Sequence, residues 1–85
     1  QHIEVSVYPN PSSGNFELSF VSDNAQLAEI HITNVTGQEV LNTILQTNNG
    51  MNQFNFDASE LKKGLYFYSV LLNNQIASGK ILITE

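Results

Sequence analysis

Hydrophobic and polar residues alternate along short blocks of this chain, with turn-forming residues between the blocks. The first three blocks cover residues 2–8, 15–21 and 27–34. Their apolar positions are Ile3, Val5, Val7, Phe16, Leu18, Phe20, Ala28, Ile30 and Ile32. Alternation with period two is the pattern of a half-buried β-strand. We therefore expect three strands that each turn one face to a core.

The second half of the chain adds four candidate strands. Residues 39–45 have a less clear phase, and residues 51–57 place two phenylalanines on one face. Residues 65–72 are almost continuously apolar, as a central strand packed on both sides would be. A last run covers residues 76–83. About seven short antiparallel strands at intervals of roughly 8–12 residues predict an all-β fold, a β-sandwich with Greek-key connections.

Turn signals separate these strands. Gly37 offers a turn between the third and fourth strands because glycine accepts positive φ. Asn-Asn-Gly at 48–50 predicts a hairpin with a type I′ turn. Residues 58–64 have some helical character, with Asp57 or Ser59 as the cap, but the segment is too short for a lasting helix.

The only two prolines lie together near the start, in Tyr-Pro-Asn-Pro at residues 8–11. Each proline lacks a backbone donor and pushes the preceding residue toward extended geometry. Strand pairing should stop there, and Ser12, Ser13 and Gly14 should turn the chain before Phe16 opens the second strand. We interpret the segment mainly as a structural corner.

Charge and composition exclude several function classes. The 85 residues contain three lysines, no arginine and eight carboxylates, a net charge of −5. Phosphate binding needs many cations, so we expect no nucleic-acid partner. Without cysteine there can be no disulfide, thiolate metal site or cysteine nucleophile. No segment is apolar over the length of a membrane span, so we expect no membrane insertion.

The chain begins at Gln1 without methionine and shows no signal peptide. We therefore expect one domain, residues 1–85, that is a fragment of a longer exported protein.

The residues offer little for catalysis or metal binding. Two histidines, His2 and His31, fall short of the three or four ligands of a zinc site. No G-x-S-x-G motif is present, and a core this small can hardly line a cleft for paired carboxylates. We expect no enzyme activity, no metal and no cofactor.

Three other patterns have plain structural explanations. Asp57 and Glu60 lack the spacing of a calcium loop and fit a capped turn better. Asn34-Val35-Thr36 matches an N-glycosylation sequon, a short pattern that matters only in a eukaryotic secretory setting. Tyr66 and Tyr68 could stack on sugar rings, but tyrosines on a central strand are more often core residues with the hydroxyl bonded to backbone.

Four blocks occur in order along the whole chain, and together they resemble a known family. They are "VYPNPSSGNF", "NVTGQEV", "SELKKGLYFYSV" and "GKILI". This set is similar to the C-terminal type A sorting domain of the type IX (Por) secretion system of Bacteroidota. The family positions matched here are Tyr8, Pro9, Asn10, Pro11, Gly14, Gly37, Leu61, Gly64 and Tyr66, followed by Lys80 and Ile81. The chain departs from many members by ending on "ITE" without a basic residue.

The resemblance implies an immunoglobulin-like β-sandwich that acts as a non-catalytic secretion signal. A cargo domain attached on the N-terminal side would cross the inner membrane, fold in the periplasm and leave through the outer-membrane translocon. The cargo would reach the cell surface or the medium, commonly after a sortase-like cysteine protease has removed the label.

Recognition by the translocon has two candidate modes. One is strand addition at an exposed sheet edge. The other is docking of the last segment, residues 80–85, with Lys80, Ile81, Leu82 and Ile83 as candidate contacts. Lys80 could equally be a strand lysine that protects an edge from aggregation.

A second function remains open from the sequence: a carbohydrate-binding or adhesin-type β-sandwich module of an exported protein. A sorting label must be the final segment of its gene product, whereas a binding module can lie anywhere. Retention on insoluble polysaccharides would favour the binding module.

Overall fold

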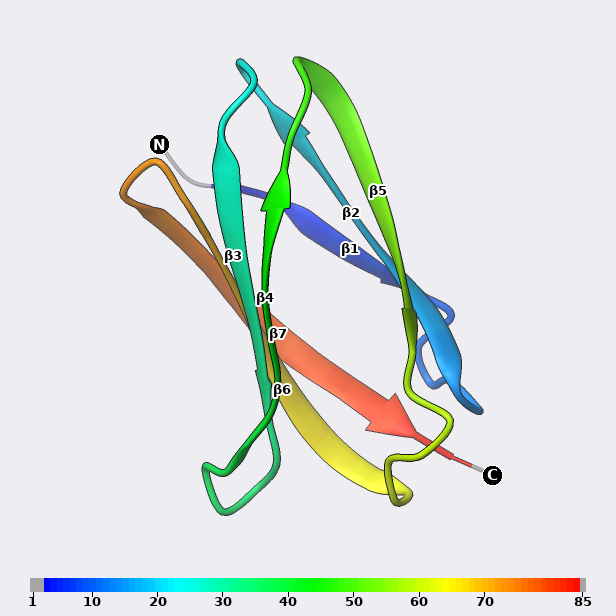
Figure 1. Cartoon of the computed structure of the whole chain (residues 1–85). Coiled ribbons are helices and arrows are strands. Elements are labelled where there is room, and N and C mark those ends of the chain that lie inside the picture. Colours follow the sequence, from blue (N-terminus) through cyan, green and yellow to red (C-terminus); the bar gives the residue numbers. More distant parts are fainter. Residues whose placement is uncertain (1–2, 85) are drawn as a thin grey trace.

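Seven antiparallel strands form two sheets packed face to face in the computed structural model, which describes residues 3–84 (Figure 1). The strands are β1 (Val5–Tyr8), β2 (Asn15–Ser22), β3 (Leu27–Thr33), β4 (Glu39–Gln46), β5 (Gly50–Asp57), β6 (Gly64–Leu72) and β7 (Gln75–Ile83). One sheet has the order β1-β2-β5 and the other β4-β3-β6-β7. The predicted all-β, immunoglobulin-like sandwich is confirmed. Within residues 3–84 no helix has the length and apolar character to cross a membrane.

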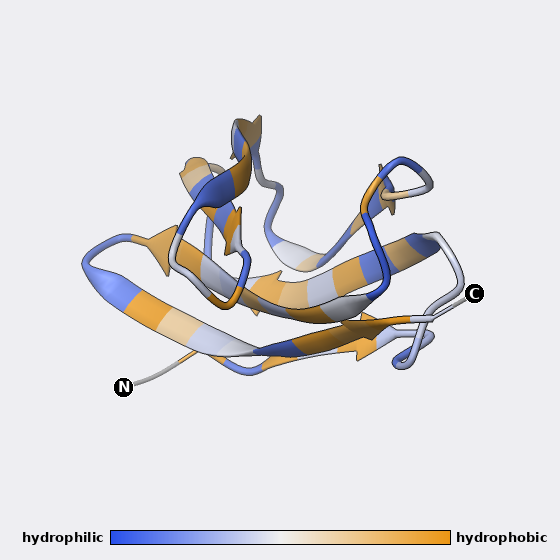
Figure 2. Ribbon diagram, turned by 90° about the horizontal axis from the view of Figure 1, so that it is seen from below, coloured by the Kyte–Doolittle hydropathy of each residue, from blue (hydrophilic) through white to orange (hydrophobic). Residues whose placement is uncertain are grey.

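The core lies between the sheets, where the alternating apolar side chains meet. Figure 2 shows hydrophobic and hydrophilic bands alternating along the strands. The buried apolar residues are Ile3, Phe16, Leu18, Phe20, Ala28, Ile30, Ile32, Ala58, Tyr66, Tyr68, Val70, Leu72, Ile81 and Ile83. Every core position predicted for residues 15–21 and 27–34 is among them, because a period of two matches the pleat.

The expectation that residues 65–72 are packed on both sides is wrong. β6 is central in its sheet, between β3 and β7, but only one of its faces meets the core. On its outer face Phe67 is 37% exposed and Leu71 is 38% exposed. No second layer covers this face of the four-stranded sheet within residues 3–84.

The hairpin predicted at residues 48–50 is also wrong. β4 and β5 belong to different sheets, so the chain crosses the sandwich here. The buried amide of Asn52 holds this crossing: its Oδ1 accepts from Asn48 N at 2.8 Å, and its Nδ2 donates to Asn48 O at 2.9 Å. The two-residue turn with positive φ at both positions occurs instead at Asn73 (51°) and Asn74 (65°), between β6 and β7.

Two other turn predictions are confirmed. Gly37, with φ of 87°, lies in the turn that joins β3 and β4. The segment after β5 makes a short turn without a helix, and Asp57 is its cap because Oδ1 accepts from Ser59 N at 3.0 Å.

Candidate functional site

The proline segment leaves the edge of the three-stranded sheet and contacts the edge of the four-stranded sheet before the chain returns to β2. β1 pairs with β2 as far as Tyr8, which confirms that pairing stops at the prolines. Both the Tyr8–Pro9 and the Asn10–Pro11 peptide bonds are cis. Beyond the prolines Ser12 forms a parallel bridge with Ile83 of β7, a pairing that the sequence analysis missed. Residues 8–12 therefore connect the edge strands β1 and β7.

Asn10 binds the edge of β7 through its side-chain amide. Its Nδ2 donates to Lys80 O at 2.9 Å, and its Oδ1 accepts from Leu82 N at 3.1 Å. The amide thus takes the place of a backbone peptide in the ladder, and two of the four sequence blocks meet here although 70 residues separate them. The requirement for a side chain that both donates and accepts explains asparagine between the prolines.

Ser12 completes this contact from inside the sandwich, where it is 1% exposed. Its backbone N donates to Leu82 O at 2.8 Å, and its backbone O accepts from Thr84 N at 2.7 Å. Its hydroxyl donates to Asn15 O at 2.6 Å and accepts from Gly14 N at 3.1 Å. We call the side formed by β1, residues 8–12 and β7 the closed side of the sandwich.

The third sequence block forms a corner at the start of β6. Tyr66 is buried, and its hydroxyl donates to Lys62 O at 2.6 Å, four residues upstream. Gly64 has φ of 148°, and Leu61 is half-buried against the core. This arrangement is the tyrosine corner of immunoglobulin-like domains. The three family positions in this block thus fix the turn between β5 and β6.

Tyr68 lies across the closed side. Its side chain is buried, its hydroxyl is 3.5 Å from Val5 O in the other sheet, and burial raises its pKa. A Cβ on Gly79 would lie 2.5 Å from that hydroxyl, so the tyrosine requires glycine there. The prediction that Tyr66 and Tyr68 are core residues is confirmed, and neither can stack on a sugar.

The four candidate recognition residues fall on two faces of β7. Ile81 and Ile83 point into the core, with 0% and 3% exposure, because β7 alternates like the other strands. Lys80 and Leu82 point outward from the four-stranded sheet, where Lys80 lies opposite Phe67. Only Lys80 and Leu82 therefore present side chains to a partner.

His31 lies on the outer face of β3 between two carboxylates. Nδ1 is 2.6 Å from Glu39 Oε2, and Nε2 is 3.2 Å from Glu29 Oε1. The hydrogen bond to Glu39, followed by that to Glu29, raises the pKa of His31 above its usual 6.5. The described residues hold no group of three or more His, Cys, Asp or Glu side chains suited to a metal ion. His2 and Glu85 lie outside the described residues.

The sequon asparagine has a structural role in the turn between β3 and β4. Asn34 Oδ1 accepts from Thr36 N at 3.1 Å and from Gln38 N at 3.0 Å. These bonds form a side-chain turn that shapes the hairpin.

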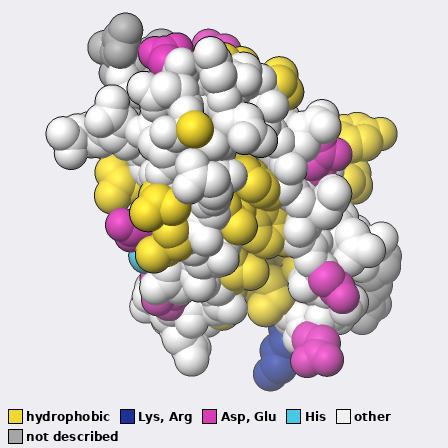
Figure 3. All heavy atoms as spheres, turned by 45° about the horizontal axis from the view of Figure 1, so that its top comes forward, with side chains coloured by type: hydrophobic (Ala, Val, Ile, Leu, Met, Phe, Trp, Pro, Cys, Tyr) yellow, Lys and Arg dark blue, Asp and Glu magenta, His cyan; other side chains and the backbone are white. Residues whose placement is uncertain are grey.

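The opposite side of the sandwich, between β4 and β5, is not closed by any described segment. We call it the open side; Figure 3 shows hydrophobic side chains along a hollow between the sheets. The half-buried apolar residues there are Val40, Leu41, Leu45, Phe54, Phe56 and Leu61. A groove of about 460 Å³ reaches from Val40 and Leu41 to the turn at 57–61.

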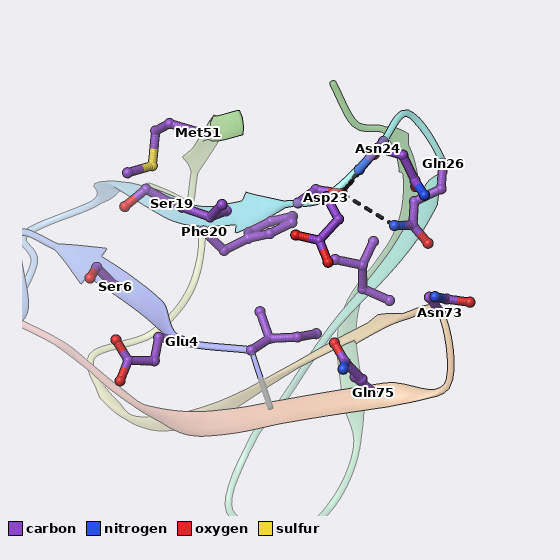
Figure 4. Close-up of a pocket in the computed structure, with 14 residues that line it drawn as sticks. Glu4, Ser6, Ser19, Phe20, Asp23, Asn24, Gln26, Met51, Asn73 and Gln75 are labelled. Carbon is purple, nitrogen blue, oxygen red and sulfur yellow. Dashed lines mark hydrogen bonds between the residues drawn. The ribbon is translucent and has the colours of Figure 1, made fainter. Parts of the chain in front are cut away.

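A second, polar pocket of about 490 Å³ lies beside β2 and the turn between β6 and β7 (Figure 4). Its carboxylates are Glu4 and Asp23, and among residues 3–84 its lining includes serines but no histidine or lysine that could act as their base. The Ser22 hydroxyl donates to Asn24 O at 2.7 Å and accepts from Gln26 Nε2 at 3.2 Å. At this pocket the Ser22 hydroxyl is therefore part of a structural hydrogen-bond network.

Comparisons with known proteins were made at the level of structure and of family. A crystal structure of a glycoside hydrolase family 3 β-glucosidase from Bifidobacterium adolescentis matches 96% of this chain with 12% identity and a TM-score of 0.47; the chain spans 17% of that protein. No curated protein gives a significant match. The model of the secretion system C-terminal sorting domain matches residues 6–84. The chain therefore belongs to the family of secretion system C-terminal sorting domains.

Proposed function

We propose that this domain is a non-catalytic sorting label that directs an attached cargo protein through the type IX secretion system. The cargo lies on its N-terminal side, passes through the periplasm and is delivered to the cell surface or the medium. The outer-membrane translocon recognises the label, and a sortase-like cysteine protease then acts on it. The observation that carries this proposal is the family match over residues 6–84.

Family membership by itself supports a C-terminal secretion sorting signal that interacts with the type IX machinery and is exported. Sorting domains of this kind are in general non-catalytic. The arrangement of the residues agrees with such a role, because the family positions lie in corners and hydrogen bonds that stabilise the sandwich. What a partner meets is therefore a folded surface rather than a reactive group.

Lys80 and Leu82 are the two of the four candidate recognition residues whose side chains are exposed. Leu82 is 40% exposed, and Lys80 is exposed on the same outer face. A lysine is less needed here to protect the edge strand from aggregation, because Asn10 and Ser12 already bind the backbone groups of this edge. We propose that the Lys80 ammonium contacts the translocon.

The function is tested by fusing residues 1–85 behind a fluorescent reporter with a periplasmic signal peptide, in a host with an active type IX system. We expect the reporter at the surface or in the medium. It should stay in the periplasm when a translocon gene is deleted. Export that is unchanged by that deletion would contradict the proposed function.

The contact at Lys80 is tested in the same host with Lys80→Ala. We expect retention of the fusion in the periplasm with an unchanged melting temperature of the purified domain, because the side chain lies outside the core. Lys62→Ala, in the turn before β6, is the matched control and should be exported normally. Normal export of Lys80→Ala would remove Lys80 from the recognition surface.

A further inference from the structure

The free edge of β5 lacks the devices that usually protect an edge strand. Its eight residues pair with β2 along their whole length, and the other edge pairs with no described strand. The strand contains no lysine and no proline, and its one charged residue, Asp57, is its last. Natural sheets commonly cover or charge such an edge, as residues 8–12 do for β7 here. An unprotected edge of this length is a template for an added strand.

The hydrogen-bond pattern identifies which backbone groups of β5 are free. Ala58 N donates to Gly14 O at 3.1 Å, and the β2–β5 register continues from this pair without a shift. Hydrogen-bonded pairs recur at every second residue of an antiparallel ladder, so Phe56 and Phe54 bond to β2. Gln53 and Asn55 therefore direct their N–H and C=O groups toward the open side.

The other edge on this side, that of β4, is less suited to a new strand. The β3–β4 register shifts between Ile32 and Thr33, so β4 begins at a bulge, and bulges twist an edge away from a partner. The sheet of β5 also has one strand fewer than the sheet that faces it. A strand added to β5 would lie over the inward side chains of β4, Leu41 and Leu45, which are only half-buried.

The groove at the end of this edge indicates the chemistry of the added strand. Apolar residues of both sheets line it, including Phe16, Ile32 and Phe56. The charged residues that line it are two carboxylates, Asp57 and Glu60. Apolar side chains at alternate positions would fill the floor, and a lysine or arginine would complement the rim.

We propose that an extended segment of the outer-membrane export machinery adds to β5 as a fourth strand, with alternating apolar side chains over the open side and a cationic residue against Asp57 and Glu60. This inference rests on the proposed function and names the mode of recognition. It adds a contact to the one at Lys80, which lies on β7 at the other edge of the opposite sheet.

The test places a proline at the free edge. Asn55→Pro removes a donor that β2 does not use, so the domain should fold while the added strand loses a backbone bond. We expect export of the reporter fusion to slow about tenfold, the change expected from losing roughly one hydrogen bond. Asn55→Ala and Asn42→Pro are the controls, because Asn42 lies at a free-edge position of β4; both should be exported normally.

A second measurement does not depend on a variant that folds. Amide exchange of the unmodified domain is followed by NMR with the purified, detergent-solubilised translocon. We expect slower exchange at Gln53 and Asn55 and no change at Asn42. Protection at Asn42 instead, or unchanged exchange at all three amides, would overturn strand addition at β5. Export of the unmodified fusion that continues without the translocon would instead contradict the proposed function itself.

Discussion

The two sides of the sandwich differ in how the backbone groups of their edge strands are covered. On the closed side, residues 8–12 cross between the sheets, and Asn10 and Ser12 use up the backbone groups at the end of β7. On the open side, β4 and β5 end their sheets without a covering segment among the described residues. The comparison indicates that the Tyr-Pro-Asn-Pro segment closes one side of the sandwich, whereas no described segment does the same on the open side.

The largest expected difference between the sides is in the cost of truncating a core side chain. Ile81→Ala on the closed side should lower the free energy of unfolding by about 3 kcal/mol, because Ile81 is fully buried and a cavity would remain. Leu41→Ala on the open side should cost about 1 kcal/mol, since this side chain is half-buried. Urea unfolding of both variants measures the difference. Equal losses would mean that the open side is as well packed as the closed side.

The next effect concerns the hydrogen bonds that close the sandwich. Asn10→Ala should lower the free energy of unfolding by about 1 kcal/mol, because Lys80 O and Leu82 N lose their partner. Asn10→Asp keeps the acceptor for Leu82 N and should recover part of the loss. The control is Asn55→Ala on the open side, which should change stability by less than about 0.5 kcal/mol. If urea unfolding gave the same free energy of unfolding for Asn10→Ala as for the unmodified domain, the amide would contribute nothing to closure.

The smallest effect is the pH dependence of stability that arises from the contacts of His31 with Glu39, at the start of β4, and with Glu29. The raised pKa of His31 means that Glu39 and Glu29 favour the protonated ring in the folded state. This stabilisation is complete below pH 6.5, the pKa of the unfolded chain, and is lost as the pH rises through the raised folded-state value. It should amount to less than about 1 kcal/mol, because the three side chains are partly exposed to solvent.

Melting temperatures measured between about pH 6 and pH 8 test this titration. Melting temperature should fall as the pH rises, and Glu39→Gln should make this fall smaller because it removes the main partner of His31. His31→Gln should abolish the fall in melting temperature altogether. If His31→Gln kept the full pH dependence, another group would be responsible.

Sequence reasoning was successful where a local period or a local turn determines the structure. The alternation in residues 15–21 and 27–34 fixed the inward faces because strands repeat every two residues. The hairpin predicted from Asn-Asn-Gly at 48–50 was wrong because the side-chain amide of Asn52 determines the path of the chain there. No local pattern distinguishes a glycine in a hairpin from a glycine after a crossing between sheets.

The contacts of the candidate site depend on long-range pairing and were out of reach of the sequence. Nothing near Asn10 indicates that its amide binds Lys80 O, 70 residues away. The signal that could have identified Gly79 was its position opposite Tyr68, and this requires the β6–β7 register. The exposed face of β6 was missed because a continuous apolar run does not reveal whether one face or both are covered.

The bond between Asn10 and the last strand also has a consequence for synthesis. Contacts between the two ends of a domain form late, because nearly the whole chain must be present before they can close. A prematurely terminated polypeptide would leave the amide of Asn10 and the backbone of Ser12 without their partners on β7. Closure of the sandwich therefore requires the last strand, and a product truncated before it would have one side unfinished.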